Sequence, residues 1–148
     1  MVQNPFSLQG EVALITGGAT GLGFAMSQCL AYAGASVVMV GRREEALQDA
    51  VHKIGTGAKY ECFDVTEVEK IPELMERIED HVGSPTILIN NAGIHLKKWA
   101  VETTDDEFLQ VLNTHVRGAF ALTRAVAPNM LKRGHGSILF IEIGRAHV

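Results

Sequence analysis

The sequence lacks the features that mark membrane and secreted proteins. Its apolar runs have the length of strands and are interrupted by glycine, so none approaches the roughly 20 apolar residues of a membrane-spanning helix. Residues 1–10 contain no apolar stretch of the kind that forms the centre of a signal peptide. We therefore expect a cytoplasmic protein with no membrane partner.

Basic blocks, metal-ligand spacings and cysteine pairs are also missing. The 13 lysines and arginines are outnumbered by 17 acidic residues, so the charge gives no reason to expect a nucleic-acid partner. The six histidines are scattered, and no metal site is predicted. Cys29 and Cys62 fall within a predicted helix and strand, where buried, reduced thiols are expected rather than a disulfide.

Five short runs rich in valine and isoleucine alternate with helical patterns in a chain of 148 residues. Strands that alternate with helices pair in parallel through right-handed crossovers, so we expect an α/β doubly wound sheet. The length allows one domain with a real core, yet it is too short for the complete fold that the pattern begins. The predicted strands are Val12–Thr16, Ser36–Val40, Ala58–Phe63, Thr86–Asn90 and Ser137–Ile141.

Local signals mark the helix ends. A helical pattern opens at Phe24 and Gly34 is expected to end it, as glycine often ends helices. Two Thr-x-x-Glu sequences match the capping box, in which the threonine and glutamate side chains bind free backbone N–H groups. The boxes are Thr66 with Glu69, before a helix to about His81, and Thr104 with Glu107, before a helix from Asp105 to Leu131 that Pro128 should kink or end.

The glycine-rich stretch Thr16–Gly23 lies between the first strand and the first helix. Such a turn aims backbone N–H groups at one point, where the positive end of the helix dipole favours an anion, so the expected ligand is a phosphate. We expect Gly17 to permit the tight turn, Gly21 to let the backbone approach a pyrophosphate, and Gly23 to bring the helix close to the strand. Without these flanks, the stretch would suit a flexible glycine loop equally well.

Three ordered motifs together resemble the short-chain dehydrogenases/reductases. They are Thr-Gly-x-x-x-Gly-x-Gly from Thr16, Asp64-Val65 after the third strand, and Asn90–Gly93 at the end of the fourth, and the resemblance runs from Phe6 to Ile141. It implies a Rossmann-type doubly wound sheet, truncated here after the fifth strand. It also implies an NAD(P)-dependent oxidoreductase that moves a hydride between nicotinamide and a carbinol or carbonyl carbon of a small-molecule substrate.

Within this family, the chain looks most like the sugar-acid and polyol dehydrogenases such as gluconate 5-dehydrogenase. The run His95–Lys98 contributes to this likeness. A 3-ketoacyl reductase is the alternative within the family, and a non-catalytic protein that binds or senses a dinucleotide is the alternative outside catalysis. A flavin or methyl-donor binder fits Asp64 and Asn90–Gly93 less well.

The resemblance assigns cofactor roles to three loops. Asp64, followed by Val65, should meet the adenine amino group, and Asn91, Ala92 and Gly93 should bring backbone against the adenosine ribose. The phosphate loop would contribute Thr16, Gly17, Ala19, Thr20, Gly21, Leu22 and Gly23.

Arg42 and Arg43 follow the second strand, where NAD-specific dehydrogenases usually carry an acid that binds the ribose 2′-hydroxyl. Guanidinium groups match a 2′-phosphate, so NADP is favoured over NAD. Alternatively, the arginines only begin a solvated helix and pair with Glu44 and Glu45.

Residues 94–99 follow the fourth-strand motif and are expected to border the substrate. His95, Lys97, Lys98 and Trp99 suit contacts to an anionic or hydroxylated substrate. The alternative is that most of these side chains simply cover the surface.

The catalytic residues of the family match this chain poorly. The family's relay asparagine aligns with His115, while Asn113 lies two residues earlier and faces about 200° away around a helix. His115 suits a proton relay, since imidazole both donates and accepts, or it is a packed helix histidine. The serine position is Ile143, the tyrosine and lysine positions fall after Val148, and Tyr32 and Tyr60 are not followed by a suitable lysine. We expect the chain alone to be inactive.

Residues 142–148 fit the codons GAG ATC GGA AGA GCA CAC GTC, the sequence of a common sequencing-library adapter. We expect residues 1–141 to form a partial NAD(P)-binding domain and residues 142–148 to be non-native. The alternative is that the chain is a short natural paralogue. The DNA sequence around Ile141 distinguishes the two. The last strand would then be an exposed edge, so the chain alone should be poorly soluble or partly folded, while the full-length form should be a homotetramer or dimer.

Overall fold

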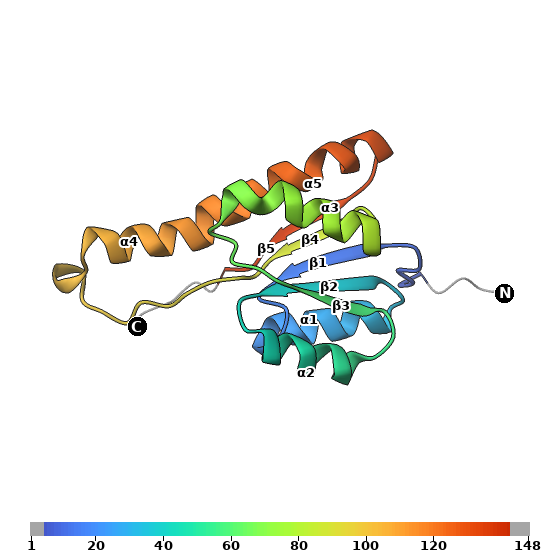
Figure 1. Cartoon of the computed structure of the whole chain (residues 1–148), viewed down its shortest axis with the longest axis horizontal. Helices are drawn as coiled ribbons and strands as arrows, with labels where there is room; N and C mark the ends of the chain where they lie inside the picture. The colour runs from blue at the N-terminus through green and yellow to red at the C-terminus, as the bar shows by residue number, and fades with distance from the viewer. Residues whose placement is uncertain (1–4, 143–148) are drawn as a thin grey trace.

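A five-stranded parallel sheet forms the centre of the molecule (Figure 1). The computed structural model describes residues 5–142. The strands lie in the order β3-β2-β1-β4-β5, and each begins and ends within one residue of its predicted bounds. Their bounds are β1 Val12–Thr16, β2 Ser36–Gly41, β3 Ala58–Cys62, β4 Ile87–Asn90 and β5 Ser137–Phe140.

Helices cover both faces of the sheet, with α1 and α2 on one side and α3 and α5 on the other (Figure 1). This arrangement is the predicted α/β doubly wound, Rossmann-like fold. Within residues 5–142, no helix is both long enough and apolar enough to cross a bilayer. The helices are α1 Gly21–Tyr32, α2 Glu44–Ile54, α3 Ile71–His81, α4 Asp105–Leu112 and α5 Ala119–Arg133, with short 3₁₀ turns at Val68–Lys70 and Ala100–Glu102.

Alternating strand residues supply two separate cores. In β1, Leu14 packs in the cluster that contains α3 and α5, whereas Ala13 and Ile15 pack in the cluster that contains α2. All five residues of β1 are buried, because successive side chains point to opposite faces and both faces are covered.

The strand order reverses at the centre of the sheet. β1 pairs with β2 on one side and with β4 on the other. β2 and β3 therefore extend the sheet in one direction from β1, and β4 and β5 extend it in the other. In open α/β sheets, ligands bind beyond the carboxyl ends of the strands at this reversal. The loops after β1, β2, β3 and β4 are therefore the relevant ones.

The predicted single helix from Asp105 to Leu131 proved wrong in its centre. A π-helical segment, Asn113–Gly118, separates α4 from α5. The helix also continues past Pro128 to Arg133, so the proline does not end it. Gly134 ends it instead, in the left-handed conformation with φ +76°.

One of the two predicted capping boxes forms. Thr104 and Glu107 make both reciprocal bonds at the start of α4. Thr66 does not cap a helix, because its backbone N–H and hydroxyl both donate to Asp64 Oδ1, at 2.9 and 2.8 Å. Glu69 pairs with Arg117 across the structure, and α3 begins only at Ile71.

Both cysteines are exposed free thiols, so the expectation of burial was wrong. Cys62 ends β3, which is an edge strand of the sheet. No described neighbour covers the side chain enough to bury it.

Candidate functional site

The glycine-rich turn after β1 leaves the start of α1 open. Gly17 and Gly21 have φ of +64° and +54°, a region that favours glycine because it has no Cβ. Thr20 is the N-cap of α1, yet its side chain makes no capping bond. Because the first N–H groups of a helix have no partner within it, this end can receive an anion.

Side chains from β1 and the β4 loop hold this turn in place. The Asn91 side-chain amide donates to the carbonyl oxygens of Thr16 and Gly17, at 3.1 and 3.2 Å. In return, the Thr16 hydroxyl accepts the backbone N–H groups of Asn91 and Ala92, at 3.0 and 2.9 Å. Four hydrogen bonds therefore join the two loops at the strand reversal.

Gly23 allows α1 to lie directly against the turn. A Cβ at this position would lie 2.0 Å from the Gly17 carbonyl oxygen and 2.6 Å from Asn91 Nδ2. By contrast, a Cβ on Gly21 would meet no atom within 4 Å. Gly21 thus leaves open space beside the turn, whereas Gly23 is required for close packing.

A cavity of about 210 Å³ lies on the β2 side of the turn. Arg42 Nη1 lies 3.8 Å from Asp64 Oδ2 at its rim. Among the described residues, neither Arg42 nor Arg43 forms the alternative ion pair with Glu44 or Glu45. Glu44 Oε1 instead accepts from Tyr60 and Gln48. Of the predicted residues, the cavity is lined by Gly17, Ala19, Thr20, Arg42, Arg43, Asp64, Val65, Ala92 and Gly93.

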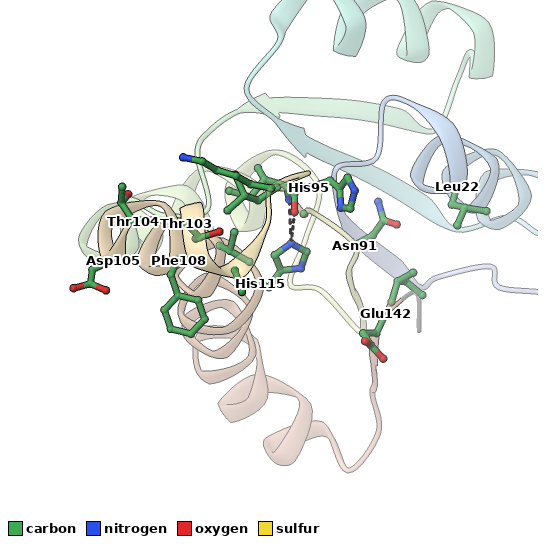
Figure 2. A pocket seen from close by; sticks show the side chains of 16 residues that line it. Leu22, Asn91, His95, Thr103, Thr104, Asp105, Phe108, His115 and Glu142 are labelled. Atoms are coloured by element: carbon green, nitrogen blue, oxygen red, sulfur yellow. Dashed lines mark hydrogen bonds between the residues drawn. The ribbon is translucent and has the colours of Figure 1, made fainter. Parts of the chain in front are cut away.

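A larger cavity of about 1080 Å³ lies on the other side of the turn, between the β4 loop and α4 (Figure 2). Leu22, Asn91 and His115 reach it from three different segments. Gly93 and Ile94 line both cavities. The glycine-rich turn therefore lies between two hollows that share Gly93 and Ile94 in their walls, as an extended ligand with a central anionic group would require.

Only part of the predicted substrate segment reaches the larger cavity. His95 and Lys98 line it, whereas Lys97 and Trp99 are not among its lining residues. Lys98 Nζ also lies 2.9 Å from Glu107 Oε2. The backbone N–H of Thr104 and this ammonium group hold the pKa of Glu107 below its usual range. Lys98 therefore joins the segment to the start of α4.

His115 contacts the backbone just after Gly93 (Figure 2). Its Nε2 lies 3.0 Å from the Ile94 nitrogen and 2.8 Å from the Ile94 oxygen, so the ring accepts the N–H in one tautomer or donates to the carbonyl in the other. A Cβ on Gly93 would lie 2.5 Å from His115 Cε1. Gly93 thus allows the ring to approach.

The remaining catalytic positions are only partly described. Ile143 and the rest of the predicted non-native tail after Glu142 lie outside the described residues. Tyr60 bonds Glu44 and Gln48, and neither it nor Tyr32 lines the larger cavity. Within residues 5–142, no group of three or more acidic, histidine or cysteine side chains is arranged to hold a metal ion.

Sequence reasoning missed Thr114, which lines the smaller cavity. Ile94 was expected only as the first residue of the substrate-bordering segment, and its backbone contact with His115 was not predicted. Neither feature carries a recognisable local signal, since Ile94 acts through backbone atoms and Thr114 reaches the site through the π segment. Glu107 was predicted only as a capping residue. Its ion pair with Lys98, nine residues earlier in the chain, was not predicted.

Comparison with known proteins identifies relatives over nearly the whole chain. Gluconate 5-dehydrogenase of Gluconobacter oxydans (strain 621H) is 37% identical over 139 residues, which cover 92% of this chain and 54% of that protein. The 3-oxoacyl-(acyl-carrier-protein) reductase of Escherichia coli (strain K12) is 32% identical over 135 residues, or 91% and 55%.

A solved structure agrees with these sequence relatives. The crystal structure of 2-keto-3-deoxy-D-gluconate dehydrogenase from Streptococcus agalactiae matches with a TM-score of 0.82 and 36% identity, covering 97% of this chain and 57% of that one. The chain spans about half the length of the curated relatives it matches. The family model described as short chain dehydrogenase matches residues 11–147, and the chain therefore belongs to the short chain dehydrogenase family.

Proposed function

We propose that the two cavities together bind NADP(H), with the diphosphate at the start of α1. The observation that supports this most directly is the position of the glycine-rich turn between the two hollows. The smaller hollow suits the adenosine, because it offers Asp64 and the β4 loop backbone. The larger hollow then has room for the nicotinamide and a substrate.

Arg42 is the residue proposed to select NADP over NAD. It lines the smaller cavity and is held near Asp64, where its guanidinium group suits a ribose 2′-phosphate. We expect Arg42→Asp to weaken NADPH binding at least tenfold, or about 1.4 kcal/mol, with little change for NADH.

The test is a fluorescence titration of the chain with NADPH and NADH. Arg124→Asp is the matched control, because Arg124 is exposed on α5 and lines neither cavity. An unchanged preference in Arg42→Asp would remove Arg42 from the proposal. Failure of a soluble parent chain with a cooperative thermal melt to bind either nucleotide would contradict the dinucleotide site itself.

The proposed reaction is hydride transfer between nicotinamide and a carbinol or carbonyl carbon, with a sugar acid or polyol as substrate. Bound nicotinamide would accept the hydride from a carbinol or donate it to a carbonyl carbon, while the protein orients the partners and moves the proton. Two matched relatives carry gluconate or deoxygluconate dehydrogenase names. The match to a 3-oxoacyl reductase supports a ketoacyl substrate as the second candidate, and turnover assays with both substrate types distinguish them.

His115 is the proposed proton-relay residue at the family's asparagine position. Nε2 contacts Ile94, which leaves Nδ1 for a relay group in the cavity. We expect the 148-residue chain alone to bind nucleotide without turnover, because neither of its tyrosines lines the cavity. A non-catalytic dinucleotide sensor would behave in the same way, so measurable turnover by this chain would exclude the sensor.

We also propose a cytoplasmic protein that works as a homodimer or homotetramer. Phe108, Leu112, Val116 and Phe120 are spaced four residues apart from α4 into α5, and each is more than a third exposed. Exposed apolar rows of this kind mark association surfaces. We expect Phe120→Glu to lower the sedimentation-derived mass, whereas a parent chain that sediments as a monomer would contradict self-association.

A further inference from the structure

Ser27 carries a buried hydroxyl on the face of α1 that lies against the glycine-rich turn. The residue is 0% exposed, and Gly23 is the only other buried residue of α1. The two are four positions apart, so they lie on the same face of the helix. A buried hydroxyl is expected to have a hydrogen-bond partner, and two carbonyl groups lie within reach of this one.

The Ser27 hydroxyl links α1 to the turn. Its Oγ lies 2.8 Å from the Gly23 carbonyl oxygen and 3.2 Å from the Gly18 carbonyl oxygen. The bond to Gly23 is common for a helical serine, which donates to the carbonyl one turn earlier, and it stays within α1. Gly18, by contrast, precedes Thr20, the N-cap of α1. Because the hydroxyl carries one proton, the two acceptors share it, and the contact with Gly18 joins the helix to the turn.

The N–H group of Ala19 belongs to the same peptide unit as the Gly18 carbonyl. In a trans peptide these two groups point in opposite directions, and none of the described peptide bonds is cis. The Gly18 carbonyl points to Ser27, so the Ala19 N–H points away from Ser27. Among residues 5–142, this N–H donates to no backbone carbonyl, and Ala19 lines the smaller cavity.

Other elements hold the preceding part of the turn. The Gly17 N–H donates to the Val40 carbonyl at 2.7 Å, and the Asn91 side-chain amide donates to the Gly17 carbonyl at 3.2 Å. Neither bond involves the peptide unit between Gly18 and Ala19. The hydrogen bond described for that unit comes from Ser27, so Ser27 is the side chain that fixes its orientation.

We propose that Ser27 is a positioning residue of the nucleotide site, which holds the Gly18 carbonyl so that the Ala19 N–H can donate to an anionic group in the smaller cavity. This inference rests on the proposed binding of NADP(H). Arg42 lines the same cavity, so a phosphate group there would meet a cation and an oriented N–H donor together. A donor that is already oriented loses less conformational freedom on binding than a mobile one.

The test compares Ser27→Ala with Thr86→Val in fluorescence titrations of the 148-residue chain with NADPH. Thr86 is the matched control, because it is also buried and its hydroxyl accepts the Val12 N–H at 3.1 Å, at the end of β1 opposite the turn. Both variants lose a buried hydroxyl, so both should melt at a lower temperature than the parent. Only Ser27→Ala should weaken NADPH binding, by about threefold to tenfold, as expected for one hydrogen bond.

The amide NMR signal of Ala19 is a second readout, which a purely structural role of Ser27 would not move. We expect NADPH to shift this signal in the parent chain. The shift should shrink in Ser27→Ala, because the peptide is then free to turn, and it should persist in Thr86→Val.

The outcomes separate this inference from the nucleotide site itself. If the parent binds NADPH, an unchanged affinity in Ser27→Ala, or an equal loss in Thr86→Val, would overturn the role of Ser27 and leave the site standing. A folded parent that binds neither NADPH nor NADH would overturn both. If Ser27→Ala does not fold, the parent decides, since an Ala19 signal that NADPH leaves unmoved would also overturn the role of Ser27.

Discussion

The side-chain amide of Asn91, in the loop after β4, donates to the carbonyl oxygen of Thr16 at 3.1 Å and so fixes the end of the neighbouring strand β1. It also donates to the Gly17 carbonyl at 3.2 Å. A residue that follows β4 thus sets the backbone shape of the glycine-rich turn 75 positions earlier in the chain. The turn is therefore shaped by tertiary contacts as well as by its glycines.

Replacing Asn91 by leucine should loosen the turn and leave two carbonyl groups without this donor. We expect the free energy of unfolding to fall by about 1–3 kcal/mol and NADPH affinity to fall about tenfold or more. Asn129→Leu is a suitable control, because Asn129 bonds Glu79 and Ser84 away from both cavities. Equal nucleotide affinities in the two variants, measured by fluorescence titration, would argue against this role for Asn91.

Gly23→Ala should be far more damaging than an alanine at an open glycine. Its Cβ would overlap the Gly17 carbonyl oxygen, so α1 must move away from the turn and nucleotide binding should be lost. Gly134→Ala introduces only backbone strain, because φ is +76° and no atom lies near its Cβ, at a cost of about 1 kcal/mol. Thermal melts and NADPH titrations of both variants check this order.

Gly93 and His115 should behave as a coupled pair. A Cβ on Gly93 would lie 2.5 Å from the His115 ring, so Gly93→Ala should lower the free energy of unfolding by about 1–3 kcal/mol. Removing the ring with His115→Ala should relieve most of that cost. A double-mutant cycle by urea unfolding measures the coupling, and strictly additive effects would mean that the loop adjusts without contacting the ring.

Glu107 should make the start of α4 sensitive to acid. Its folded-state pKa is lowered by the Thr104 N–H and Lys98, so its contribution to stability is complete above the ordinary pKa of 4.5 and is lost as pH falls through the folded value. We expect Glu107→Gln to be less stable than the parent near neutral pH, and the gap to shrink in acid. Urea midpoints across this range measure it; a gap independent of pH would contradict the assignment.

The strands and the glycine-rich turn could be predicted because their signals are local. Buried runs such as Val12–Thr16 are bounded by glycine, and Gly17 adopts the positive φ that its place in the turn indicates. The capping box at Thr104 also depends on residues within one turn of helix. Distant partners add to these features rather than replace them, since Asn91 bonds the turn and Lys98 pairs with Glu107 of the capping box.

The errors arose where contacts outside the matched sequence pattern compete. Thr66 matches a capping box in sequence, yet Asp64 takes its hydroxyl and Arg117 takes the Glu69 carboxylate. The π segment has no local sequence signal. Its last residue, Gly118, packs closely against the loop after β3, where a Cβ would lie 2.7 Å from the Val65 carbonyl oxygen, and this contact is known only from the fold. The ion pair of Lys98 with Glu107 is likewise tertiary.

The π segment also determines how the two parts of the long helix are oriented about their common axis. A π turn contains more residues than an α turn, so every side chain after Gly118 is rotated from the position that an unbroken α-helix would give it. Leu122, Val126 and Met130 are buried in the core with this rotation in place. Deleting one residue from Asn113–Gly118 would let the helix become regular only by turning either this buried row away from the sheet or His115 away from Ile94.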